Sequence, residues 1–270
     1  MSLIVVALLL IVGIFAVLPA SASDRPRFHL ECPFVRHRMA DPIVHPGEPG
    51  TGHLHAFFGN KTTDAFSTFR SLRAGGSTCG HPGDRSAYWT PAVYSGGSIV
   101  RAIDADFYYR GTTEPSTAIR PFPSGLRIIA GNADATGPQS RRIIEWSCSG
   151  GSNYSTRPPN CGGDYVRAHV RFPECWDGSR LDSRNHTAHM RYAVKSASGR
   201  SVCPGSHPVP VPMLELTFTF PVHDGSTISL ATGKYFTMHA DFINAWNKTA
   251  LRGLVRRCIH AGIQCPAFTA

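Results

Sequence analysis

The stretch "MLELTFTF", residues 213–220, decides the fold class because apolar and polar side chains alternate along it. Side chains of an extended chain point to opposite faces in turn, so one face of this segment is apolar throughout. This pattern is typical of an antiparallel strand with one face in the core. The apolar face carries Leu214, Leu216, Phe218 and Phe220.

Similar short apolar runs recur along the chain and are separated by Gly- and Pro-rich turns, as in proteins built from many strands. We therefore expect a mainly β protein, a disulfide-stabilised, jelly-roll-like β-sandwich forming one domain over residues 23–270. The clearest further strand candidates are residues 100–109, 125–131, 141–148 and 165–172.

The last of these candidates has a cationic face. Arg167, His169 and Arg171 alternate with apolar residues, so the three side chains share one side of the strand. They could line a groove for an anion, but the solvent-facing side of an antiparallel sheet is the favoured interpretation.

One helix is predicted near the C-terminus, in "DFINAWNKTALRGLVRRCIHAG", residues 241–262. Apolar side chains recur there at helical spacing. Asp241 stands where an N-cap belongs, and Gly262 stands where the helix should end.

The N-terminal segment has the features of an export signal. No charged residue lies between Leu3 and Leu18, and Ala20-Ser21-Ala22 resembles a signal-peptidase site. An uncleaved anchor is the alternative, but the run is shorter than the ~20 residues that cross a bilayer. We expect residues 1–22 to be a cleaved signal peptide and the protein to be secreted, with no membrane insertion afterwards.

Eight cysteines behind an export signal indicate up to four disulfides. Two pairs would each close a short loop, and these are Cys148 with Cys161 and Cys258 with Cys265. The remaining cysteines suggest Cys175 with Cys203 and Cys32 with Cys79.

The formal net charge of +9 suggests anionic surroundings, such as an acidic polysaccharide. Nucleic-acid binding is not expected because no long run of basic residues occurs, and we expect a monomer. The sequence contains no G-x-S-x-G nucleophile elbow, P-loop or dinucleotide fingerprint, which disfavours the enzyme classes that use them.

Thirteen histidines are the main chemical signal, and several lie in loops rich in Gly and Pro. In "HPGEPGTGHLHAFFGN", residues 45–60, an extended chain would point His53 and His55 the same way. His239 and Asp241 repeat this spacing. These four residues could bind one divalent transition metal if the fold brings them together, because imidazole and carboxylate are its common ligands.

The same residue types suit catalysis on a sugar polymer, by hydrolysis or by elimination next to a uronate carboxylate. The candidate catalytic residues are His53, His55, His189, His239 and Asp241. The candidate substrate-binding residues are Asn60, Arg70, Arg73, Tyr88, Trp89 and Trp176, although a core position is the favoured interpretation for Trp89 and for Trp176. Two alternatives stay open: a non-catalytic carbohydrate-binding or wall-associated module that uses the aromatic residues, and a metal-dependent hydrolase of another substrate class.

Several blocks of the chain resemble a known family. They include "MADPIVHPGEPGTGHLHAFFGN", "SAYWTPAVY", "FPECWDGSRLDS", "HTAHMRY", "CPGSHPVPVPMLEL" and "HADFINAWN". They are similar, in this order, to the signature blocks of Domain of Unknown Function 1996, a family of secreted fungal and bacterial proteins. The resemblance implies secretion, a β-rich domain with eight cysteines and a role near extracellular polymers, but no reaction. Its histidine blocks correspond here to His53 and His55, His186 and His189, His207, and His239 with Asp241.

Overall fold

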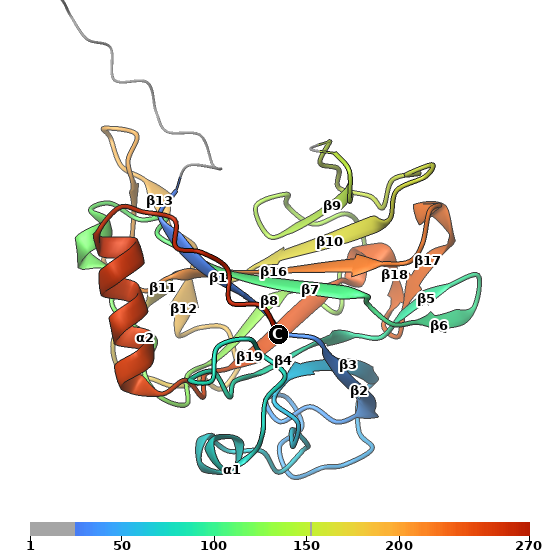
Figure 1. Ribbon diagram of the computed structural model, residues 1–270, viewed down its shortest axis with the longest axis horizontal. Helices are drawn as coiled ribbons and strands as arrows, with labels where there is room; N and C mark the ends of the chain where they lie inside the picture. The colour runs from blue at the N-terminus through green and yellow to red at the C-terminus, as the bar shows by residue number, and fades with distance from the viewer. Residues whose placement is uncertain (1–24, 152) are drawn as a thin grey trace, which may run out of the picture.

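Two five-stranded antiparallel sheets form the body of the protein (Figure 1). The computed structural model describes residues 25–151 and 153–270, so the predicted signal peptide lies outside the described residues. Sheet A has the order β1 (Arg27–Glu31), β7 (Asp104–Arg110), β16 (Met213–Phe220), β10 (Val166–Arg171) and β9 (Ile144–Cys148). Sheet B has the order β2 (Phe34–Met39), β3 (Leu54–Gly59), β4 (Ala87–Pro91), β19 (His239–Ile243) and β8 (Arg127–Gly131). The predicted mainly β fold is confirmed.

The described residues also form three smaller sheets. A four-stranded sheet has the order β18 (Gly233–Lys234), β17 (Ile228–Leu230), β5 (Val93–Ser95) and β6 (Ser98–Val100). A three-stranded sheet contains β12 (Met190–Arg191), β11 (Cys175–Trp176) and β15 (Val209–Pro210). The last pair is β13 (Val194–Lys195) with β14 (Ser201–Val202).

The main core lies between the two large sheets, as the alternation in residues 213–220 predicts. Phe218 of sheet A packs on Phe58 of sheet B with ring centroids 4.7 Å apart, and Phe107 packs on Tyr88 at 4.5 Å. All four side chains are buried. Burying rings of this size is the largest favourable contribution to such a sandwich.

A second, smaller core covers the outer face of sheet B. Phe57 and Trp89 stack there with centroids 5.7 Å apart, and Leu72 of the short helix α1 (Phe69–Ala74) packs in the same cluster. The segment between β2 and β3 and helix α1 lie together on this side, below sheet B in Figure 1. Both faces of sheet B are therefore covered, which buries neighbouring side chains regardless of the face they occupy.

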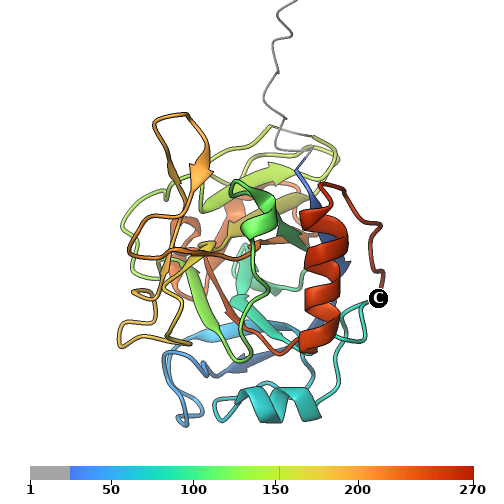
Figure 2. The ribbon, with the colours of Figure 1, turned by 90° about the vertical axis from the view of Figure 1, so that its left-hand side faces the viewer.

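The predicted C-terminal helix exists but begins later than predicted. Helix α2 spans Lys248–Leu254 and continues as a π-helical turn over Val255–His260. It lies along one side of the sandwich (Figure 2). Asn247 is the N-cap, because its side chain accepts hydrogen bonds from two backbone N–H groups of the first turn. Asp241 instead belongs to β19, so its predicted role as N-cap is wrong. The predicted end at Gly262 is confirmed by its φ of 73°.

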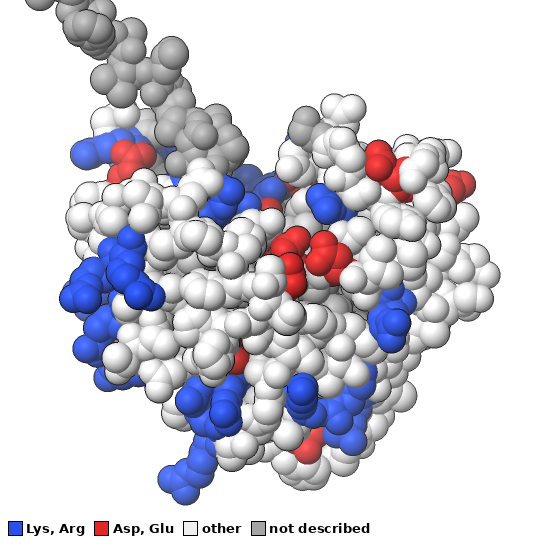
Figure 3. Space-filling view, in the orientation of Figure 1, with Lys and Arg blue, Asp and Glu red and all other residues white. Residues whose placement is uncertain are grey.

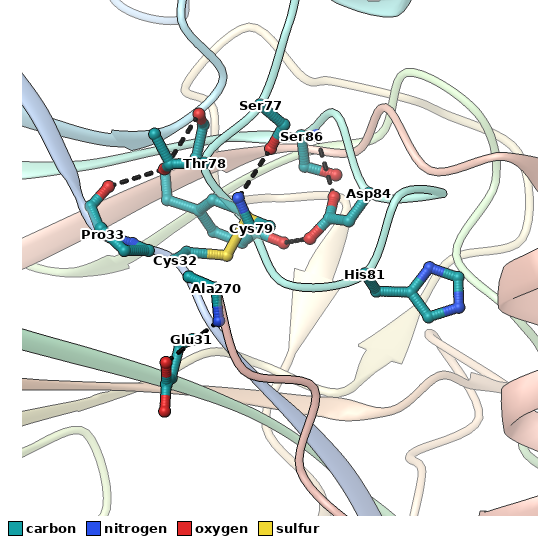
Figure 4. The surroundings of a disulfide bond; sticks show 12 residues. Glu31, Cys32, Pro33, Ser77, Thr78, Cys79, His81, Asp84, Ser86 and Ala270 are labelled. Carbon is teal, nitrogen blue, oxygen red and sulfur yellow. Dashed lines mark hydrogen bonds between the residues drawn. A yellow bond between two sulfur atoms is a disulfide. The ribbon is translucent and has the colours of Figure 1, made fainter.

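All four predicted disulfides are present: Cys32–Cys79, Cys148–Cys161, Cys175–Cys203 and Cys258–Cys265. Figure 4 shows that Cys32–Cys79 ties the chain just after β1 to the loop before β4, beside the buried Asp84. The Tyr88 hydroxyl donates a hydrogen bond to this carboxylate at 2.5 Å. Within the described residues, no helix has both the length and the apolar character needed to cross a bilayer.

The cationic row of β10 does not form a free anion site. Arg171 pairs with Glu145 at 2.7 Å and with Glu215 at 3.3 Å, and Arg167 donates to Thr219. The positive charge of Arg171 is therefore balanced within the sheet. Figure 3 shows acidic side chains over the middle of this view of the molecule, with Lys and Arg scattered around its rim.

Candidate metal centre

Two strands of sheet B bring the predicted histidines together. His53 directly precedes β3 and His55 lies within it, while His239 and Asp241 lie in β19. Strands β3 and β19 flank β4, where Trp89 pairs with both Phe57 and Asp241. The i, i+2 spacing places the four site residues on the outer face of the sheet, beside the smaller core.

The three imidazole rings are in contact. The ring centroids of His53 and His55 lie 4.1 Å apart, those of His53 and His239 lie 5.1 Å apart, and those of His55 and His239 lie 6.0 Å apart. One ligand atom from each ring lies within 4.8 Å of the other two. Ligands of one ion bound at about 2.1 Å lie within about 4.2 Å of each other, so small side-chain rotations would complete a site.

Hydrogen bonds fix the tautomers of two rings. His55 Nδ1 lies 2.9 Å from the carbonyl oxygen of Ala40, and His239 Nδ1 lies 3.0 Å from that of Thr237. A carbonyl oxygen only accepts, so each Nδ1 must carry the proton and donate. Each Nε2 of the neutral ring therefore presents a lone pair, and metal-binding histidines are oriented in the same way.

The ligand atoms that face one another have no partner in the described structure. His53 Nε2, His55 Nε2 and Asp241 Oδ2 are buried without a hydrogen bond. Asp241 Oδ2 lies 3.9 Å from His239 Nε2. A buried polar atom without a partner costs about 1–3 kcal/mol, so three converging atoms are expensive unless a ligand satisfies them. A cation would satisfy all of them at once, and these residues therefore fit a metal ion.

The electrostatics of the cluster favour neutral imidazoles. Burial lowers the pKa of His239 to about 4, with the charge of His53 adding to the shift. Burial also lowers the pKa of His55 well below its usual value and lowers that of His53. Burial and the charge of Asp41 raise the pKa of Asp241 well above its usual value. A positive ion would supply the charge that this buried carboxylate lacks.

Two further residues complete the cluster and are not among the predicted site residues. Asp41 is buried, and its Oδ1 accepts hydrogen bonds from the backbone N–H groups of Ile43 and Val44 at 2.9 Å each. A ligand atom of Asp41 lies within 4.8 Å of ligand atoms of His55 and Asp241. Because Nδ1 of His55 donates to the carbonyl oxygen of Ala40, only its Nε2 is free for an ion. The three histidines and the set of Asp41, His55 and Asp241 therefore share this atom and form one centre.

His45 lies at the solvent side of the centre. Its ring is 3.5 Å from Glu48 and about a third exposed, and its positive form would lower the pKa of His53. Gly52 makes room for this ring, since a Cβ there would lie 3.2 Å from it, and its φ of +84° suits glycine. The only sequence signal for Asp41 and His45 is their presence in the same quoted block as His53 and His55, because their spacing matches no ligand motif.

His189 does not join the cluster. Its Nδ1 contacts the Ser183 hydroxyl at 3.0 Å, and its Nε2 donates to the carbonyl oxygen of Arg127 at 2.6 Å. Arg127 pairs with Ile243, four residues along β19 from His239, which is about 13 Å along the strand. His189 thus ties a loop to the far end of β8.

The predicted substrate-binding residues are dispersed. Tyr88 and Trp89 are fully buried in the two cores, so their rings cannot stack on a sugar in this structure. Asn60 is also fully buried and donates to two backbone carbonyl groups, and Arg73 donates to those of Gly83 and Ala245.

The other two predicted substrate-binding residues remain accessible. Trp176 is half-buried, and its Nε1 donates to the carbonyl oxygen of Arg180. Arg70 is exposed on α1. Neither residue is part of the histidine cluster.

One comparison with known proteins gives a match. A family model described as "Domain of unknown function (DUF1996)" matches residues 41–246, a range that contains every residue of the centre. No curated protein and no solved structure matches the chain significantly.

Proposed function

We propose that this chain, which belongs to the family of the domain of unknown function DUF1996, is a secreted metal-dependent enzyme that cleaves an extracellular polysaccharide. The observation that supports this most is the convergence of unpartnered ligand atoms from His53, His55 and Asp241 around His239. Buried polar groups normally have hydrogen-bond partners, and the grouping of several unpartnered ligand atoms distinguishes this cluster from a single unpartnered group such as Trp146 Nε1. The four disulfides agree with an extracellular location.

The donor set favours a divalent transition metal. Imidazole nitrogens suit zinc, copper, iron or nickel, and thiolate ligands are absent because the described chain has no free cysteine. His55 and His239 would hold the ion in a fixed orientation through their Nδ1–H groups, and Asp241 would balance its charge. A bound divalent ion would supply Lewis acidity and lower the pKa of a bound water molecule.

His53 and His45 would face the substrate. His53 is only half-buried, while His55, His239 and Asp241 are buried, so solvent reaches the cluster from the His53 side. The lowered pKa of His53 keeps its ring neutral near pH 7, so its Nε2 keeps a lone pair for the ion at the solvent side of the centre. His45 beside Glu48 stands at the same opening and could return a proton to a leaving group.

A second candidate function is metal-free acid–base catalysis by the same residues, in an elimination or hydrolysis. It is favoured by the pKa of Asp241, which burial raises so far that this side chain could be the acid while His53 is the base. The third candidate, a non-catalytic carbohydrate-binding module, loses two of its three aromatic residues because Tyr88 and Trp89 are buried, whereas Trp176 remains accessible.

Elemental analysis of the protein purified without chelators distinguishes these functions. We expect about one transition-metal ion per chain in the wild type and nearly none in a His53→Ala/His55→Ala variant. A His186→Ala/His223→Ala variant is the matched control, because it removes two histidines that lie outside the cluster and should keep the ion. A wild-type protein without metal, or a cluster variant that retains it, would contradict the proposal.

A further inference from the structure

A hollow of about 310 Å³ lies next to the proposed metal centre. Its walls are the end of β2, the loop around Pro49 and Gly50, and the turn that contains Asp64 and Phe66. This volume is at the small end of ligand pockets, which span about 300–1,000 Å³.

The hollow is directly connected to the centre through the backbone. Ala40 lines the hollow, and its carbonyl oxygen holds Nδ1 of His55. Asp41, the next residue, belongs to the cluster. Arg38, another wall residue, pairs with His55 across β2 and β3, and such cross-strand partners lie on the same face of a sheet.

An exposed aromatic ring forms one side of the hollow. Phe66 is 62% exposed, more than any other large hydrophobic side chain of the described residues, and the neighbouring Met39 is 45% exposed. The turn that carries Phe66 is fixed, because Asp64 Oδ1 accepts hydrogen bonds from the Phe66 N–H and from the Ser67 hydroxyl. A rigidly held, exposed aromatic ring is typical of a recognition surface.

The charge of the hollow comes from Arg38 and Asp64. Arg38 is exposed and makes no hydrogen bond or ion pair within residues 25–151 and 153–270. A free guanidinium binds a carboxylate through two parallel hydrogen bonds. Asp64 has acceptor oxygens that suit sugar hydroxyl groups.

We propose that this hollow binds a uronate residue of an anionic polysaccharide, next to the bond that is cleaved at the histidine centre. Arg38 binds the carboxylate, Phe66 packs against the face of the sugar ring, and Asp64 accepts from a hydroxyl group. The inference rests on the proposed function for the identity of the neighbouring reaction, but the binding itself needs no metal. It assigns a substrate class and new specificity residues to the site.

Binding measured without metal tests this inference separately. The probes are polygalacturonate and alginate, titrated in EDTA by calorimetry, with fully methyl-esterified polygalacturonate as the uncharged counterpart. We expect the wild type to bind at least one of the two acidic polymers and to bind the esterified polymer much more weakly. Arg38→Gln and Phe66→Ala should each reduce the affinity about tenfold or more, because the first removes a charged bidentate donor and the second removes the ring that packs against the sugar.

Two controls separate this site from other causes. Arg256→Gln removes an exposed arginine on the C-terminal helix, so it should bind like the wild type, whereas attraction by net charge alone would weaken both arginine variants equally. Because the titrations are made in EDTA, loss of the proposed metal function leaves this result intact. If the wild type binds neither acidic polymer, or if Arg38→Gln and Phe66→Ala bind as tightly as the wild type, the inference is wrong.

Discussion

Asp241→Asn should have opposite effects on stability with and without metal. The Asp241 side chain is 1% exposed, and its Oδ2 has no hydrogen bond in the described structure. In metal-free protein, the substitution removes a buried, unpartnered carboxyl group whose raised pKa favours the neutral form and whose burial costs about 1–3 kcal/mol. The metal-free variant should therefore be as stable as the metal-free wild type, or more stable by up to about 2 kcal/mol.

With metal present the order should reverse. An ion at a hundred times its dissociation constant stabilises the folded wild type by about 2.7 kcal/mol, which for a chain of this size raises Tm by roughly 5–10 °C. The neutral amide that replaces the carboxylate would lack the negative charge that balances the ion, so the variant should lose most of this gain.

The assay is thermal unfolding of both proteins in EDTA and in saturating Zn²⁺. Asp134→Asn is the control, because this exposed carboxylate lies outside the cluster and its loss should change neither curve. An equal loss of stability in both conditions would show that Asp241 has a purely structural role. The absence of a Zn²⁺-dependent shift in the wild type would refute the reasoning altogether.

Two further predictions concern substitutions at Asp84 and Gly131. Burial raises the pKa of Asp84 to about 6, so the folded state binds more protons than the unfolded state between about pH 4 and 6, and stability falls as pH rises through this window. Asp84→Asn should reduce this fall in the free energy of unfolding by about 3 kcal/mol, as measured by urea unfolding at several pH values. A variant with the same pH dependence as the wild type would contradict this prediction. Gly131→Ala should cost about 1–3 kcal/mol and weaken metal binding, because its φ is +87° and a Cβ would lie 2.9 Å from His239 Cα. Calorimetric titration with Zn²⁺ checks this prediction. The control is Gly137→Ala, which should behave like the wild type because a Cβ at this position meets only open space.

Local patterns of the sequence predict the sheet strands β7, β8, β9, β10 and β16, and short sequence separation predicts the disulfides Cys148–Cys161 and Cys258–Cys265. The alternation in residues 213–220 places apolar side chains on the face that packs against sheet B, and β16 spans that same range. The start of the helix is not predictable in this way, because the apolar spacing before residue 247 fits both a helix and a strand. Pairing of β19 with β4 and β8 and the cap at Asn247 select the strand, and neither interaction is visible in a single periodic segment.

The sequence predicts the two pairs of site residues, but it does not predict the complete set of residues that forms the site. His53 with His55 and His239 with Asp241 share a face in extended chain, so their pairwise orientation follows from spacing. Their convergence depends on the sheet order β3-β4-β19, which residue spacing does not encode. Tyr88 and Trp89 are candidates for stacking on a sugar, but both faces of sheet B are covered, so both are buried, as favoured for Trp89 from its residue type.

Anomalous diffraction at the absorption edge of the bound metal tests the central claim most directly. Crystals of the protein purified without chelators should show one strong peak among the imidazole rings of His53, His55 and His239, next to Asp241. The ligand atoms should lie about 2.0–2.2 Å from the ion. A peak at another position, or a fully ordered histidine cluster that contains no metal, would contradict the account.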